Sequence, residues 1–108
     1  MIAEILALAA RLPAGLPDPA ALFKLHREEE ELLTAIADHD HTGALTEIAD
    51  MAYYAIKVIH LAASWLDLDV DTALQLAVAK YALRARPGNP KDDGAERAAC
   101  LAVLQEAN

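Results

Sequence analysis

The sequence is poor in aromatic residues and cysteine, so its fold has to be stabilised mainly by the packing of helices. Aromatic residues make up 5% of the 108 positions, and Cys100 is the one cysteine. A lone cysteine cannot close an internal disulfide, which suits a reducing compartment, so we expect a cytoplasmic protein. No basic segment precedes an apolar stretch at the N-terminus, and we therefore expect no signal peptide.

Positive charge and long apolar runs are also scarce. Lys and Arg number nine against seventeen Asp and Glu, which gives a formal net charge of -8. Nucleic acids are bound through basic surfaces, and a helix needs ~20 apolar residues to span a bilayer. We therefore expect neither a nucleic-acid nor a membrane partner. An acidic protein can still bind an anionic substrate where metal ions reverse the local charge.

The hydrophobic fraction is nonetheless high, at 56%. Most of these residues are Ala and Leu, which lose little conformational freedom on entering a helix. No segment alternates with period two for long enough to form a strand. The length suits a single domain over residues 1–108, and the apolar content favours a homo-oligomer.

Helix starts and breaks divide the chain into short connections and helices. Asp18 and Pro19 form a strong helix start, and Pro87 and Pro90 form a firm break. We expect an all-α bundle of four to five helices. The expected helices are Ile2 to Leu12, Pro19 to Ala37, Thr42 to Leu66, Val70 to Arg86, and Asp92 or Asp93 to Glu106.

Two of these helices each carry a pair of carboxylates three residues apart. Glu28 and Glu31 share one side of the helix at 19–37, and Glu47 and Asp50 share one side of the helix at 42–66. In each helix the first carboxylate is expected at the edge of the apolar stripe and the second just beyond it. The stripes consist of Leu22, Leu25, Leu32, Leu33 and Ile36, and of Ile48, Met51, Ala55, Val58, Ile59 and Ala62.

An antiparallel pairing of these two helices would bring the four carboxylates together. Oxygen-rich clusters suit hard cations such as Mg²⁺ or Mn²⁺, which would relieve the repulsion between the charges. The competing interpretation is a solvated acidic face, such as the one expected for Glu30, and periodicity gives the two even weight. Glu29 falls near the middle of its apolar stripe, where it could join the cluster, pair with a cation of another helix or mark a wider groove.

The ordered set E-x-x-E, spacer and E-x-x-D resembles the all-α nucleoside triphosphate pyrophosphohydrolases. These are the MazG-like enzymes and their relatives, which include the dimeric dUTPases and phosphoribosyl-ATP pyrophosphatase. Glu28 and Glu31 match the first pair, Glu47 and Asp50 match the second, and the fifteen residues 32–46 form the spacer. Residues 79–84 and 89–93 resemble a basic segment of some members, and the resemblance covers roughly residues 22–96.

The resemblance implies a MazG-like helical domain that assembles as a dimer or a dimer of dimers. It also implies hydrolysis of a nucleoside triphosphate between the α- and β-phosphates, with Mg²⁺ as the cofactor and Mn²⁺ as a substitute. Glu28, Glu31, Glu47 and Asp50 would be the metal ligands and catalytic residues, with Glu28 or Glu31 accepting the proton of water.

The substrate contacts that go with this interpretation are basic and aromatic side chains. Lys80, Arg84 and Lys91 would bind phosphate oxygens, although Lys80 and Arg84 also fit a solvated i, i+4 pair. Tyr54 and Lys57 share the side of Asp50 and are further candidates. Their alternatives are an interface tyrosine and a lysine whose stem lies along the helix.

One residue departs from the family pattern. Arg27 stands where many members have a Glu directly before the first pair, which leaves the number of metals open. Two other classes of protein therefore remain open. A non-catalytic helical dimer with a degenerate metal site would be compatible with Arg27 and Glu29. A di-metal carboxylate bundle would need Glu-x-x-His pairs, and neither motif has a His at that place.

Overall fold

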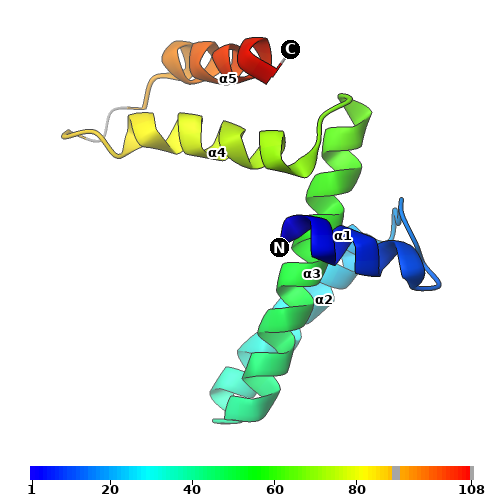
Figure 1. The fold of residues 1–108 in the computed structure, drawn as a ribbon. Helices are drawn as coiled ribbons and strands as arrows, with labels where there is room; N and C mark the ends of the chain where they lie inside the picture. The colour runs from blue at the N-terminus through cyan, green and yellow to red at the C-terminus, as the bar shows by residue number, and fades with distance from the viewer. Residues whose placement is uncertain (89–90, 108) are drawn as a thin grey trace. The chain divides into compact units, whose positions relative to one another are not determined.

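The computed structural model describes residues 1–88 and 91–107. Within these residues the chain forms five α-helices and no strand, so the prediction of an all-α protein is confirmed (Figure 1). The helices are α1 (Ile2–Arg11), α2 (Ala21–Ala37), α3 (His41–Trp65), α4 (Val70–Arg84) and α5 (Asp93–Ala107). None of the helices in this part of the chain is both long and apolar enough to cross a membrane.

Aspartate side chains start three of the helices. Asp40, Asp69 and Asp92 each accept a backbone N–H from the residue three positions on, at 2.9, 2.7 and 3.1 Å. These bonds satisfy amide groups that have no partner inside the helix. Asp18 instead closes a turn through the Ala20 amide at 3.1 Å, so α2 begins two residues later than expected. At the predicted break, α4 ends before Pro87, and Pro90 lies outside the described residues.

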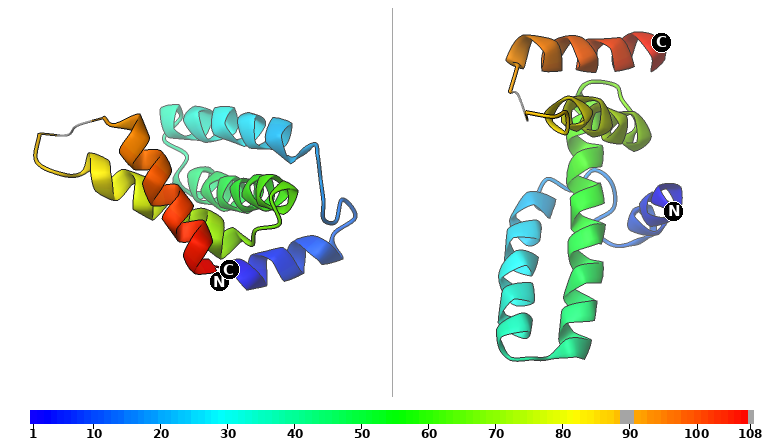
Figure 2. Two further views of the ribbon diagram at one scale, coloured as in Figure 1. Left: turned by 90° about the horizontal axis from the view of Figure 1, so that it is seen from above. Right: turned by 90° about the vertical axis from the view of Figure 1, so that its left-hand side faces the viewer.

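The chain divides into two compact units, Met1–Leu66 and Asp67–Asn108. In the first unit α2 and α3 run antiparallel and side by side, and α1 lies on the other side of α3 (Figure 2). In the second unit α4 packs against α5. The single domain expected over residues 1–108 remains a prediction.

The buried side of α2 differs from the expected one. Leu22, Leu33 and Ile36 are exposed, although all three belong to the predicted stripe. The residues of α2 that are buried or half-buried are Ala21, Lys24, Leu25, Glu28, Leu32 and Ala35. The prediction that Glu28 lies at the edge of the buried stripe is therefore wrong. α2 has apolar residues on two adjacent sides, and periodicity merged them into one.

On α3 the predicted stripe holds at Met51, Ala55, Val58 and Ile59, which are half-buried, and fails at Ile48 and Ala62, which are exposed. Glu47 and Asp50 are half-buried, whereas Ile48 of the predicted stripe is exposed. Glu47 therefore lies within the buried side of α3 rather than at its edge. Because the helices of this unit pair through these sides, Glu28, Glu47 and Asp50 are carried into the contact between α2 and α3.

A buried ion pair joins the loop before α2 to the middle of α3. The Lys57 ammonium donates to Asp18 Oδ2 at 2.9 Å, and the two side chains are only 2% and 8% exposed. The bond from Lys57 lowers the pKa of the Asp18 carboxyl from its ordinary value. Lys24 lies 3.5 Å from the same oxygen but remains 41% exposed.

We expect Asp18→Asn to lower the free energy of unfolding by about 2 kcal/mol. The amide would leave the buried Lys57 ammonium without its counter-ion, and a hydrogen bond to a charged group is worth about 1.5–3 kcal/mol. Urea unfolding followed by circular dichroism measures this loss. Asp38→Asn makes the same change at an exposed position and should cost much less. Equal losses in the two variants would contradict the importance of the ion pair.

Candidate functional site

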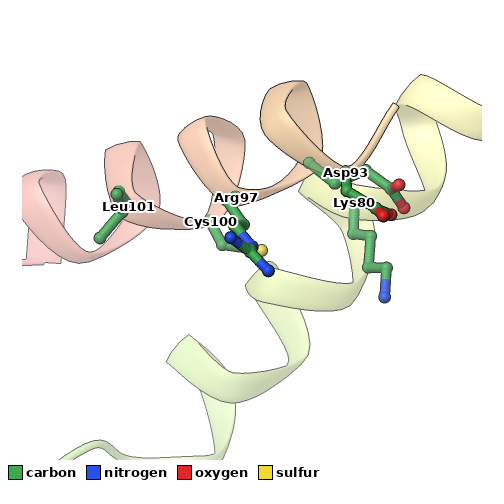
Figure 3. A pocket seen from close by; sticks show the side chains of 6 residues that line it. Lys80, Asp93, Arg97, Cys100 and Leu101 are labelled. Atoms are coloured by element: carbon green, nitrogen blue, oxygen red, sulfur yellow. The ribbon is translucent and has the colours of Figure 1, made fainter. Parts of the chain in front are cut away.

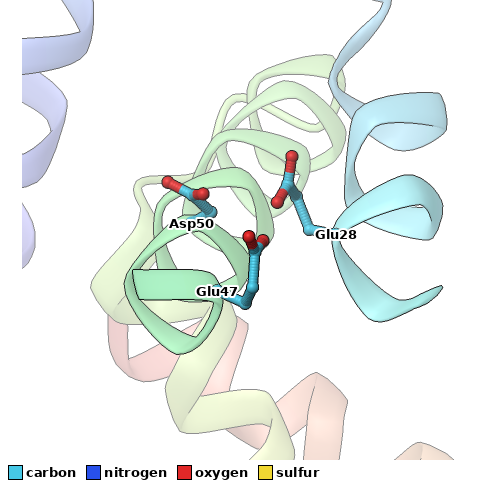
Figure 4. Close-up of side chains that lie close together, drawn as sticks. All are labelled: Glu28, Glu47 and Asp50. Atoms are coloured by element: carbon cyan, nitrogen blue, oxygen red, sulfur yellow. The ribbon is translucent and has the colours of Figure 1, made fainter. Parts of the chain in front are cut away.

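Three carboxylates from the antiparallel helices α2 and α3 meet in the first unit. One oxygen from each of Glu28, Glu47 and Asp50 lies within 4.8 Å of the other two (Figure 4). The tight turn at residues 38–40, with His39 in the left-handed region at φ 56°, reverses the chain so that Glu28 of α2 faces Glu47 of α3. The predicted convergence therefore holds for three of the four carboxylates by distance.

The fourth carboxylate, Glu31, lies beside the cluster. Its side chain is exposed, but its carboxylate is near enough to contribute to the raised pKa of Glu28. It is therefore placed next to the three clustered groups rather than among them. Glu30 is exposed, as expected for the solvated face of α2.

Glu28 is the group most affected by this crowding. The adjacent carboxyl group of Glu47, burial, and the neighbouring Glu31 and Asp50 together raise the pKa of Glu28 to about 8. Like charges held close together cannot all ionise without a cost, and one of the group therefore retains its proton. Near neutral pH the metal-free cluster carries a proton on Glu28.

Two oxygens of the cluster have no donor. Glu28 Oε2 and Glu47 Oε2 are shielded from solvent, and no described residue donates a hydrogen bond to either atom. A buried acceptor without a donor is costly unless something else binds it. Carboxylate oxygens are the ligands that Mg²⁺ and Mn²⁺ prefer, so the donor set and its unsatisfied atoms fit a divalent cation.

The surroundings of Glu29 narrow the three roles that the sequence leaves open for it. The Glu29 side chain is exposed, and Nδ1 of His26 on the same helix lies 3.6 Å from its carboxylate. Glu29 is therefore not placed in the cluster, and it lies on the same exposed side of α2 as Leu33 and Ile36. Arg27 is also exposed.

Of the two substrate candidates on α3, one is committed elsewhere. Lys57 is buried and bound by Asp18, so we do not count it among the residues available to a substrate. Tyr54 is half-buried, and the Lys24 ammonium lies 5.8 Å from the centre of its ring. Tyr54 remains a candidate.

The three basic candidates downstream belong to the second unit. Arg84 Nε donates to Glu96 Oε1 at 2.8 Å, and its guanidinium lies 5.3 Å from the centre of the Tyr81 ring. Lys80 lines a cavity of about 570 Å³ together with residues of α5, among them Arg97 and Cys100 (Figure 3). Lys91 is exposed. Arg84 is thus an ion-pair partner within this unit, and the role of Lys80 and Lys91 toward phosphate remains a prediction.

Sequence reasoning missed two buried acidic residues, Asp18 and Glu96. Glu96 is 5% exposed and precedes Ala99 and Cys100 by three and four residues. An acid in line with an apolar stripe was the available signal. Asp18 beside Pro19 predicts a helix cap, and nothing local indicates its partner Lys57, thirty-nine residues away.

Comparisons with models of protein families, with curated proteins and with solved structures gave no match.

Proposed function

We propose that this protein hydrolyses a nucleoside triphosphate between the α- and β-phosphates, with Mg²⁺ held by Glu28, Glu31, Glu47 and Asp50. The observation that carries the proposal is the meeting of Glu28, Glu47 and Asp50 across two helices, where two buried oxygens receive no hydrogen bond from the described residues. The order of these carboxylates resembles the MazG-like pyrophosphohydrolases. A solvated acidic face would not place Glu28 and Glu47 inside a helix contact.

Besides the cation, the reaction requires a group that accepts a proton from water, and the carboxylates of α2 can supply it. When bound, Mg²⁺ neutralises phosphate charge and lowers the pKa of a coordinated water. Glu28 is the carboxylate that holds a proton near pH 8, and Glu31 lies beside it. Glu31 is exposed and lies outside the cluster of three, so it is the carboxylate of this pair placed to accept a proton from the attacking water.

Release of pyrophosphate from a panel of nucleoside triphosphates, with and without Mg²⁺, tests the proposal. We expect pyrophosphate only when the divalent cation is present. Pyrimidine deoxynucleotides are the first substrates to try. The absence of release from every nucleotide of the panel would instead favour a non-catalytic helical protein.

We also propose that two copies of the chain associate through the exposed apolar sides of α2 and α3. Leu33 and Ile36 of α2 and Leu45 and Ile48 of α3 are all more than half exposed. Apolar side chains repeated on one side of a helix pair indicate a protein interface rather than solvent contact. A closed homodimer is the simplest assembly that would cover them.

We expect Leu33→Glu combined with Ile48→Glu to convert the dimer to a monomer. Each change places a charge where apolar contact is proposed, and burying an unpaired charge is strongly unfavourable. Sedimentation at micromolar concentration measures the change. Thr34→Glu combined with Ala49→Glu adds the same two charges at the exposed neighbours of Leu33 and Ile48 and is the matched control. A wild-type chain that sediments as a stable monomer would contradict the proposed dimer.

A further inference from the structure

We propose that Lys24 binds the phosphate chain of the nucleotide, an inference that rests on the proposed function for the identity of the ligand. The sequence makes Lys57 a candidate substrate contact on α3, with a lysine whose stem lies along the helix as the alternative. In the structure Lys57 and Lys24 have different surroundings. Lys57 is buried against Asp18, whereas Lys24 keeps 41% of its side chain exposed.

The charge balance around Asp18 leaves one cation in surplus. Asp18 carries one negative charge and faces two ammonium groups. The bond to Lys57, at 2.9 Å, is short and buried, while Lys24 lies at 3.5 Å and is open to solvent. An exposed contact at that distance is weak, so a phosphate can replace Asp18 as the partner of Lys24 at little cost. Lys57 cannot do the same without emerging from its buried position.

Lys24 lies one helical turn from the carboxylate cluster. Lys24 precedes Glu28 by four residues on α2, and Tyr54 follows Asp50 by four residues on α3, so each pair lies on one side of its helix. Glu28 meets Asp50 across the two helices, and the Lys24 ammonium lies 5.8 Å from the centre of the Tyr54 ring. Lys24 and Tyr54 thus form the next layer of the same helix contact.

This arrangement suits a polyphosphate that extends from the carboxylate cluster to the layer of Lys24 and Tyr54. A cation held by the carboxylates would bind phosphate oxygens in one layer, and the Lys24 ammonium would donate to oxygens in the next. The approach of Lys24 over the Tyr54 ring limits the positions that its side chain can take. Both groups belong to the first unit, in which α2 and α3 are packed together.

Lys24→Met tests the inference through two effects of opposite sign. The probe is a nucleoside triphosphate in which a methylene group joins the α- and β-phosphorus atoms, and its binding is measured in the presence of Mg²⁺. Removing a phosphate donor should raise the dissociation constant of this probe roughly tenfold. Removing a positive charge near the acidic cluster should leave the binding of Mn²⁺ alone unchanged or slightly stronger. Calorimetry measures both, and the non-hydrolysable nucleotide keeps the result independent of turnover.

Matched variants separate this role from a structural one. Lys24→Arg keeps the charge and should retain most of the affinity for the nucleotide. Arg27→Met removes an exposed cation of the same helix and should change the affinity less than twofold. Unchanged nucleotide affinity in Lys24→Met, equal losses in the Lys24 and Arg27 variants, or weaker binding of Mn²⁺ alone would each overturn the inference. The absence of nucleotide binding by the wild type would also overturn the inference. The proposed function is tested separately, by hydrolysis of an ordinary nucleoside triphosphate.

Discussion

Asp50→Asn is expected to reduce pyrophosphate formation by at least about a hundredfold. Asp50 contributes one of the three oxygens that meet across α2 and α3, and the amide removes a negative charge from the cluster. Mutating a residue that hydrogen-bonds to a metal ligand typically lowers metal affinity or activity about 10- to 100-fold. Removing a direct ligand should therefore cost at least the upper end of that range. Initial rates of pyrophosphate release at saturating Mg²⁺ measure the loss.

Two other variants show whether this loss is specific to the site. Glu30→Gln removes one negative charge from the exposed side of α2 and should change the rate little. Lys80→Ala removes one candidate phosphate donor and should cost less than Asp50→Asn, since the carboxylates remain intact. Similar losses in the Glu30 and Asp50 variants would contradict the geometry of the site.

The second large effect is a cation-dependent rise in melting temperature that grows with pH. A saturating divalent cation, at about a hundred times its dissociation constant, stabilises the fold by about 2.7 kcal/mol, or roughly 10 °C for a chain of this size. The cation competes with the proton on Glu28, whose pKa lies at about 8. The shift caused by Mg²⁺ should therefore be small near pH 6 and reach its full value above pH 8.

The metal-free protein should show the opposite trend. The pKa of Glu28 rises on folding from 4.5 to about 8, so the folded state binds the proton more tightly than the unfolded state. The stability contributed by this proton is fully present below pH 4.5 and is lost as the pH rises through about 8. Thermal melts of Glu28→Gln without metal should lack most of this decline.

A variant of a second ligand completes this test. Glu47→Gln should abolish most of the thermal shift caused by Mg²⁺ or Mn²⁺, because it removes a charged ligand from the cluster. An unchanged metal response in Glu47→Gln would contradict the assignment of the site.

The sequence predicted the helices well because their ends are marked by local chemistry. Asp40, Asp69 and Asp92 cap the helices that follow them, and Pro87 follows the end of α4. The candidate cluster could also be predicted, since Glu28 and Glu47 occupy equivalent places on two helices joined by a short turn. These features depend on residues that are close in sequence.

What could not be predicted depends on contacts between distant residues. The side of α2 that packs on α3 could not be chosen, because Leu33 and Ile36 form a second apolar side as regular as the buried one. The sequence makes Lys57 a candidate substrate ligand because its helical position matches that of Asp50. Only the fold places Asp18, at the end of a loop, within 2.9 Å of its ammonium.

Phosphorus NMR of the first products tests the central claim most directly. With wild-type protein, Mg²⁺ and a nucleoside triphosphate, we expect a nucleoside monophosphate and pyrophosphate to appear together, with no orthophosphate at early times. In Asp50→Asn the same signals should be nearly absent. A nucleoside diphosphate and orthophosphate as the first products would contradict hydrolysis between the α- and β-phosphates at this cluster.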